Sequence, residues 1–200
     1  NQEKAPWKGV AGLENRVEAE FLHPVLLGES ILPYRVMRAF EAVIPVTTSG
    51  EILDAAGAAN RGFEGLYGWM SKAETAWKAH SESGTMTLVN RWNYHNELGA
   101  QFPLAGMRIL YAASGSLPAA CVLRDRRAVI EHVLYWMTAS NEDEAHYLVA
   151  ILNSETARSQ AERFQARGQF GARHFDKVMF NLPIPRFDAS NDLHRSITKA

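Results

Sequence analysis

Residues 107–138 have the sequence MRILYAASGSLPAACVLRDRRAVIEHVLYWMT, and this stretch decides the fold class. Three of its segments are rich in β-branched and aromatic residues and predict strands: 107–113, 119–123 and 129–138. The gap SGSLP between the first two predicts a turn. The gap RDRR, residues 124–127, has the length of a hairpin connection, so we expect an antiparallel arrangement with RDRR at a hairpin tip.

The residues before this stretch alternate between strand and helix patterns. Residues 85–92 predict another strand, and residues 42–46 predict a short strand that Pro45 confines to a sheet edge. Over residues 52–80 the apolar side chains follow helical spacing. Residues 1–35 contain two prolines within ten positions, Pro24 and Pro33, and we expect an extended lead-in that packs on the main body.

The last third predicts helices with clear ends. Asn141 followed by Glu144 has capping-box spacing, Ser154 caps a second helix, and Asn191 begins a final one. Leu148 and Phe164 fall on the apolar faces of the first two helices, where we expect core positions.

These patterns define an α+β fold, with a mostly antiparallel sheet from the middle third and C-terminal helices packed against it. The 200 residues favour one domain with small additions. We expect a lead-in over 1–35, the domain over 36–188 and the start of a C-terminal helix over 189–200.

Composition narrows the class of protein. With 46% hydrophobic and 22% charged residues, the chain is not largely disordered. No apolar stretch reaches the roughly 18 residues of a membrane span, so we expect no membrane partner. The single cysteine, Cys121, favours a reducing compartment, and we expect a cytoplasmic protein. Because the first residue is Asn and no signal segment follows it, we expect a fragment of a longer cytoplasmic chain.

Charge is unevenly distributed along the chain. The net charge is −1, but residues 151–200 carry eight Lys/Arg and five Asp/Glu, a net +3. A local basic face can bind phosphates whatever charge the rest of the molecule carries, because salt screens fields beyond about 8 Å. The alternative is a solvated surface with no partner.

Motifs for catalysis and metal binding are missing. The seven histidines and one cysteine show no metal-ligand spacing, and neither a serine-hydrolase elbow nor a phosphate-binding loop is present. We therefore expect no catalytic residue, metal or cofactor in this chain.

The segment RFQARGQFGARH, residues 163–174, has the composition of a recognition surface. Arginine and glutamine are residue types that read guanine and adenine edges, and glycines let backbone N–H groups approach phosphates. A basic loop in another surface role is the alternative.

Several motifs, in this order along the chain, resemble the C-terminal part of restriction–modification DNA adenine methylases. They are FLHPVLLGES (21–30), PYR (33–35), NYHNEL (93–98), QFP (101–103), LYW (134–136), EAHYLVAILNS (144–154), RGxFG (167–171) and NLPIP (181–185). The similar region of those enzymes is the target-recognition domain, here residues 36–188.

The resemblance implies sequence-specific recognition of double-stranded DNA on behalf of a separate, N-terminal catalytic domain. S-adenosylmethionine is expected on that domain, since this chain has neither the [DNS]-P-P-[FYW] signature nor the Gly-rich cofactor turn. The specificity subunits of type I restriction enzymes share the domain type and are an alternative. A protein-interaction domain, with Trp69, Trp77 and Trp92 on a partner surface, is the other alternative.

From residue chemistry we predict two groups of DNA contacts. The main group is Gln160, Arg163, Arg167, Gln169, Arg173 and Lys177. The second candidate contact is the RDRR segment, with Arg124, Arg126 and Arg127.

Overall fold

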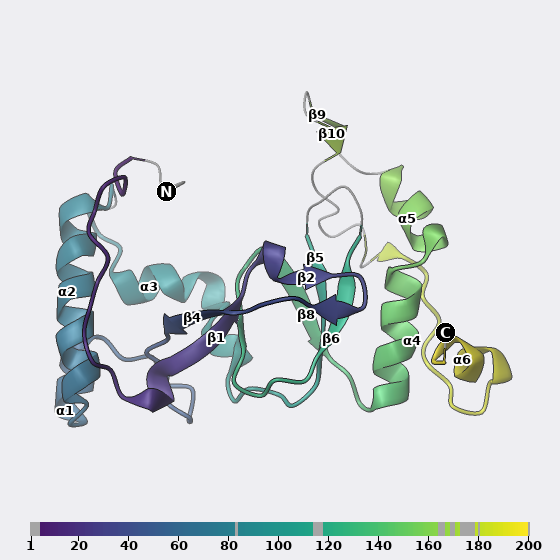
Figure 1. The fold of residues 1–200 in the computed structure, drawn as a ribbon, viewed down its shortest axis with the longest axis horizontal. Helices are drawn as coiled ribbons and strands as arrows, with labels where there is room; N and C mark the ends of the chain where they lie inside the picture. The colour runs from purple at the N-terminus through teal and green to yellow at the C-terminus, as the bar shows by residue number, and fades with distance from the viewer. Residues whose placement is uncertain are drawn as a thin grey trace. The chain divides into compact units, whose positions relative to one another are not determined.

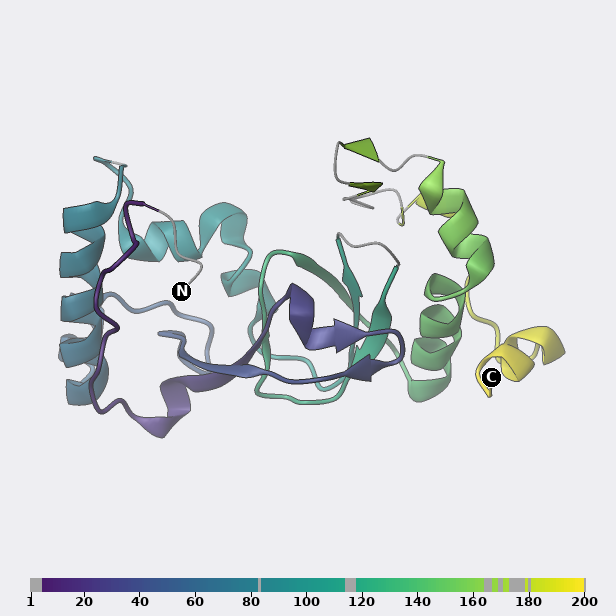
Figure 2. The same ribbon diagram turned by 45° about the horizontal axis from the view of Figure 1, so that its top comes forward.

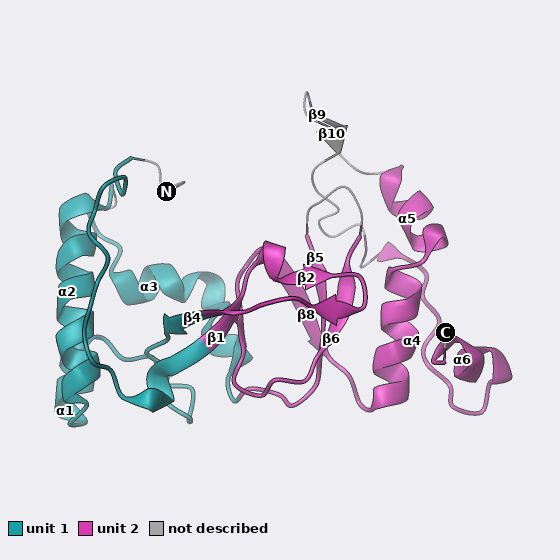
Figure 3. Cartoon of the chain, viewed as in Figure 1, with its two compact units in different colours: residues 1–23, 41–103 teal, residues 24–40, 104–200 magenta. Residues whose placement is uncertain are grey.

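The computed structural model describes residues 5–82, 84–113, 118–163, 167–168, 171–172, 179 and 181–199. The chain forms two compact units (Figure 3). The first unit consists of Asn1–His23 and Glu41–Pro103, and the second of Pro24–Phe40 and Leu104–Ala200. The segments 1–35, 36–188 and 189–200 expected from the sequence divide the chain differently, and that division stays a prediction.

A three-stranded antiparallel sheet lies at the centre of the second unit (Figure 1). Its order is β6 (Ala120–Leu123), β5 (Arg108–Ala112), β8 (Leu134–Thr138). Leu110 on β5 is opposite Cys121 on one side and Trp136 on the other. Every residue of β5 is buried, because cores cover both of its faces. The predicted α+β class with an antiparallel sheet is confirmed.

Three helices follow the sheet in the second unit: α4 (Glu142–Leu152), α5 (Glu155–Glu162) and α6 (Asp192–Ile197). Helix α4 packs on β5 and β6 and buries Ala145 and Val149 against Ile109. Each helix begins at the predicted cap, Asn141, Ser154 or Asn191, whose side-chain oxygen accepts a backbone N–H. Leu148 is half-buried against this core, and Phe164 lies outside the described residues.

Short strands complete the second unit. Strand β7 (Val129–Ile130) pairs in parallel with the end of β1 (Leu22–Leu26), Val25 opposite Val129. Strands β2 (Ile31–Leu32) and β3 (Arg35–Val36) form a hairpin after the 3₁₀ helix η2 (Gly28–Ser30). Strands β9 (Arg167–Gly168) and β10 (Gly171–Ala172) form another antiparallel pair.

The predicted hairpin around RDRR is wrong. Residues 119–123 pair with β5 rather than with residues 129–138, which are themselves divided into β7 and β8. Between β7 and β8 the chain turns at Glu131, whose carboxylate accepts the Val133 N–H at 3.1 Å and whose carbonyl accepts the Leu134 N–H at 3.0 Å. RDRR therefore connects strands of two different sheets.

The first unit is mainly helical. Its helices are α1 (Ala55–Asn60), α2 (Glu64–His80) and α3 (Leu88–Trp92), with 3₁₀ turns η1 (Ala19–Phe21), η3 (Tyr94–Asn96) and η4 (Gly99–Gln101). Phe21, Leu53, Leu66 and Met70 form its core. The helical pattern over 52–80 is interrupted at Gly62, whose φ of +77° ends α1.

The N-terminal residues of the first unit supply a cap that α2 lacks. The Glu18 carboxylate accepts the N–H groups of Gly65 at 2.9 Å and Leu66 at 2.8 Å. Gly65 has no room for a side chain, because a Cβ there would lie 2.6 Å from the Arg16 carbonyl oxygen. The expectation that the lead-in packs on the main body thus holds for this part of the segment.

Two predicted strands in the first unit need correction. The segment 85–92 contains α3 (Leu88–Trp92) instead of a strand, because Thr87 caps the helix and Leu88, Val89 and Trp92 face the core at helical spacing. The short strand predicted over 42–46 is β4 (Phe40–Val43), followed by a single bridge between Val46 and Ile52. Within the described residues, no helix has the length and hydrophobicity needed to cross a membrane.

Candidate nucleic-acid interface

Helix α5 presents two of the predicted contact residues to solvent. Ala157 and Ala161 bury one face of the helix in the core, which leaves Gln160 and Arg163 exposed. Arg163 is also the C-terminal cap of α5, where the helix dipole favours a positive charge. Both side chains are therefore accessible, and their contact with DNA stays a prediction.

The remaining members of the main group are only partly placed. The backbone of Arg167 lies in β9, but its side chain is not described. Gln169, Arg173 and Lys177 lie outside the described residues. Their expected contacts with DNA stay predictions.

The RDRR segment, between β6 and β7, exposes Arg124, Arg126 and Arg127. Arg124 is engaged within the protein: its Nε and Nη2 donate to the two carboxylate oxygens of Glu142 at 3.0 and 2.5 Å. These hydrogen bonds raise the pKa of Arg124 and lower that of Glu142. Nη2 also lies 3.0 Å from His146 Nε2. Arg124 is therefore a weaker candidate for phosphate binding than its sequence suggests.

Arg108 supports the RDRR segment from within the protein. Its side chain is 0% exposed, and Nη2 donates to the carbonyl oxygens of Asp125 at 3.1 Å and Ala128 at 2.7 Å. Burial lowers the pKa of the guanidinium, and attraction to Asp125 partly opposes that change. Sequence reasoning missed this residue, although an arginine in the apolar run MRILYA is itself unusual.

The RDRR segment and the start of α5 lie at opposite ends of α4. Glu142, the first residue of α4, holds Arg124, whereas Asn153, which follows its last residue, binds Ala120 at the start of β6. Eleven helical residues separate these ends by about 16 Å. The structure therefore does not bring the RDRR segment and the start of α5 together.

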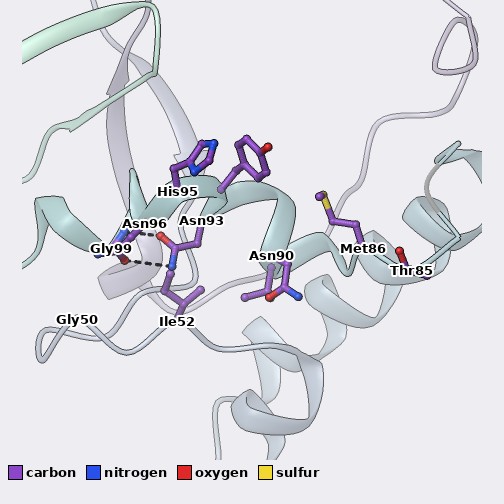
Figure 4. A pocket seen from close by; sticks show the side chains of 11 residues that line it. Gly50, Ile52, Thr85, Met86, Asn90, Asn93, His95, Asn96 and Gly99 are labelled. Atoms are coloured by element: carbon purple, nitrogen blue, oxygen red, sulfur yellow. Dashed lines mark hydrogen bonds between the residues drawn. The ribbon is translucent and has the colours of Figure 1, made fainter.

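A separate cavity of about 680 Å³ lies in the first unit, around the NYHNEL motif (Figure 4). Asn93 organises it: its Oδ1 accepts the Gly99 N–H at 2.8 Å, and its Nδ2 donates to Asn96 Oδ1 at 3.3 Å. His95 and Asn96 have φ of 53° and 62°, conformations that are uncommon outside glycine.

The lining of this cavity contains no Asp, Glu, Lys or Arg among the described residues. The cavity presents amide groups and the exposed Tyr94 ring, which suit uncharged groups of a ligand. Its described lining has no Lys or Arg side chain that could bind a phosphate. Nor does the described part of the chain hold a group of three or more His, Cys, Asp or Glu that could bind a metal. The candidate contacts with the DNA backbone thus lie in the second unit.

The tryptophans of the alternative partner surface are half-buried. Trp69, Trp77 and Trp92 pack against the core of the first unit, and the Trp77 indole donates to the Met86 carbonyl at 2.7 Å. These contacts favour a structural role for the three rings over a partner surface.

Comparison with known protein families finds no matching family model, and no curated protein matches the sequence. The resemblance to adenine methylases therefore rests on the sequence motifs alone and stays an expectation. In the second unit, residues of two of these motifs make hydrogen bonds between separate segments of the chain. Asn153 of EAHYLVAILNS accepts the Ala120 N–H at 2.8 Å and donates to the Ala120 carbonyl at 2.9 Å. Tyr147 donates its hydroxyl to the carbonyl of Pro185, the last residue of NLPIP, at 3.1 Å.

Proposed function

We propose that this chain is a sequence-specific double-stranded DNA recognition module of an adenine-N6 DNA methyltransferase or restriction–modification enzyme. In this proposal it positions the target base for a separate catalytic domain, on which S-adenosylmethionine binds and the methyl group is transferred. The chain itself supplies DNA contacts only.

One observation carries the proposal: in the second unit, internal hydrogen bonds use residues of two of the methylase-like motifs, whereas two of the predicted contact residues are exposed. The residues that resemble the methylases, Asn153 and Tyr147, are used in hydrogen bonds that join α4 to β6 and to the NLPIP segment. The exposed side chains of Gln160 and Arg163 make no hydrogen bond or ion pair within the part of the chain that the structure describes. A scaffold held by internal hydrogen bonds, with free polar side chains on its surface, suits a domain whose contacts must vary with the DNA sequence.

The two kinds of side chain have different expected roles. Arg163 and Arg167 suit phosphates, which give affinity without sequence information, whereas Gln169 and Arg173 suit base edges. Phosphate contacts make binding depend on salt concentration, because each one releases counterions from DNA.

The proposal is tested by charge reversal on this surface. We expect the triple variant Arg163→Glu, Arg167→Glu, Arg173→Glu to lose binding to a fluorescein-labelled 30-bp duplex of mixed sequence. Fluorescence anisotropy at 50 mM NaCl measures the loss, and repeating the titration at higher salt gives the salt slope. Each lost phosphate contact lowers that slope by about one.

The control is Lys78→Glu, which makes one reversal of the same kind at an exposed position of α2 in the first unit. This variant is expected to bind DNA nearly as the unchanged chain does. If the triple variant binds as tightly as the control, the proposed surface is wrong. If the unchanged chain does not bind the duplex at low salt, the proposed function is wrong.

A further inference from the structure

The hairpin β2–β3 exposes a group of large apolar side chains. The exposed fractions are 48% for Leu32, 61% for Tyr34 and 53% for Met37. Two-residue turns at hairpin tips usually carry small polar residues or glycine, so an exposed aromatic ring at this point calls for a reason. None of the predicted DNA contacts includes this hairpin.

The backbone of Tyr34 is unfavourable for its side chain. Its φ is +69°, a conformation that favours glycine, and the preceding residue is Pro33. Proline followed by a residue with positive φ is the pattern of a type II turn, in which glycine normally takes the second place. A tyrosine occupies this position in spite of the strain, and functional sites are where such strain collects.

Hydrogen bonds connect the tip of this hairpin to the start of α5. The Tyr34 N–H donates to the Ala120 carbonyl at 2.8 Å, and the same carbonyl accepts Nδ2 of Asn153 at 2.9 Å. Asn153 directly precedes Ser154, the cap of α5. Figure 2 shows the hairpin lying along the sheet of the second unit. Tyr34 therefore lies at the end of α4 from which α5 starts, not at the RDRR end.

Arg35 directly follows Tyr34 at the hairpin tip, whereas Arg38 lies beyond the other end of the hairpin, beside Glu29. Arg35 and Arg38 are both exposed, and Arg38 stacks over Phe40 with its guanidinium carbon 4.2 Å from the ring centroid. The Glu29 carboxylate lies 3.6 Å from Arg38 and offsets one charge. An aromatic and apolar tip flanked by arginine complements nucleic acid, whose bases stack on rings and whose phosphates bind cations.

We infer that the β2–β3 hairpin, residues 31–36, is a second DNA-contacting element in which the Tyr34 ring stacks on bases and Arg35 binds a neighbouring phosphate. This inference rests on the proposed function and extends it from surface contacts to unstacking of the bases. Apolar and aromatic wedges that enter DNA unstack neighbouring base pairs, which eases extrusion of a target base.

The test uses variants that remove the ring without straining the turn. Tyr34→Gly and Tyr34→Asn both suit a positive φ, so each should have a melting temperature equal to or above that of the unchanged chain. Each should bind the labelled 30-bp duplex about 5- to 100-fold more weakly, the fold-change for one lost base–aromatic stack. Tyr34→Phe keeps the ring and should bind within about twofold of the unchanged chain.

The outcomes separate this inference from the proposed function. If Tyr34→Gly and Tyr34→Asn bind normally while the triple arginine variant does not, the hairpin plays no part and DNA recognition by α5 stands. If Tyr34→Phe loses as much binding as Tyr34→Gly, stacking is refuted. If the unchanged chain binds no duplex, both ideas fail together.

Discussion

Arg108 places a charged side chain in the interior of the protein. It is fully buried, yet its Nε and Nη1 have no hydrogen-bond partner among the described residues. Only Nη2 is used, and it joins β5 to the carbonyls on both sides of the RDRR segment. A buried cation is costly unless it is paired, so these two bonds are its main compensation.

We predict that Arg108→Met lowers the free energy of unfolding by about 1–3 kcal/mol. Methionine fills similar apolar space but leaves the Asp125 and Ala128 carbonyls without their donor. Urea denaturation measures the change. Arg126→Ala, on the exposed side of the same segment, should stay within about 0.5 kcal/mol of the unchanged chain. Equal effects of the two substitutions would contradict the supporting role of Arg108.

At the scale of elements, the start of α4 has both a capping side chain, Asn141, and a titratable carboxylate, Glu144. Asn141 Oδ1 accepts the Glu144 N–H at 2.9 Å, and Glu144 Oε2 accepts the Ser140 N–H at 2.7 Å. The bond from the Ser140 backbone lowers the pKa of Glu144 below its ordinary value of 4.5. The ionised form of Glu144 is therefore the one that stabilises the folded chain.

We predict that Glu144→Gln reduces stability at pH 7 by about 0.5 kcal/mol, the usual contribution of a carboxylate at a helix N-terminus. Because the pKa is lowered on folding, this contribution is complete above pH 4.5 and disappears as the pH falls through the folded-state pKa. Thermal melts at pH 7 and pH 3 measure it. The two chains should differ at pH 7 and differ less at pH 3, and a constant difference would contradict the assignment.

Helix ends were predictable from the sequence because their signals are local. Asn141, Ser154 and Asn191 satisfy N–H groups two or three residues away, so the pattern and the structure agree. The failures depend on contacts with distant residues. Residues 85–92 have strand-like composition. They contain α3 instead, because Thr87 caps this helix and its apolar side chains pack against the core of the first unit. Strand β6 pairs with β5 rather than with the nearer residues 129–138. The lengths of the connecting segments do not indicate which of these two partners β6 takes.

The candidate site shows the same limit. Helical periodicity placed Gln160 and Arg163 outside the core, and the structure agrees. The ion pair between Arg124 and Glu142 joins residues 18 positions apart and was not predictable from composition. The positive φ of Tyr34 was not foreseen either, because tyrosine gives no local sign of such a backbone.

On the scale of the whole molecule, the chain forms two compact units where the sequence favours one domain. The chain passes between the units after residues 23, 40 and 103. Each passage lies within or beside a helix or strand, so no Gly- or Ser-rich linker marks it in the sequence. Cys121 reports on one unit only: it is buried in the second unit, and burial raises the pKa of its thiol to about 12.

We predict that core truncations in the two units have different effects on Cys121. Leu152→Ala removes a buried side chain of the second unit and should cost about 2–5 kcal/mol, raising the rate of native-state thiol labelling at least about tenfold. Leu66→Ala makes the same change in the first unit and should leave that rate nearly unchanged. Equal acceleration by both would mean that the units open together.

The parallel pairing of β1 with β7 also constrains the order in which a ribosome can complete the fold. Val25 leaves the exit tunnel more than a hundred residues before its partner Val129. Meanwhile Glu41–Pro103, which completes the first unit, has already emerged. One edge of β1 can pair with β4 early, but the edge that pairs with β7 must stay open until the first unit is finished. Slow translation across residues 104–130 prolongs the time during which this edge is open to other chains and to chaperones.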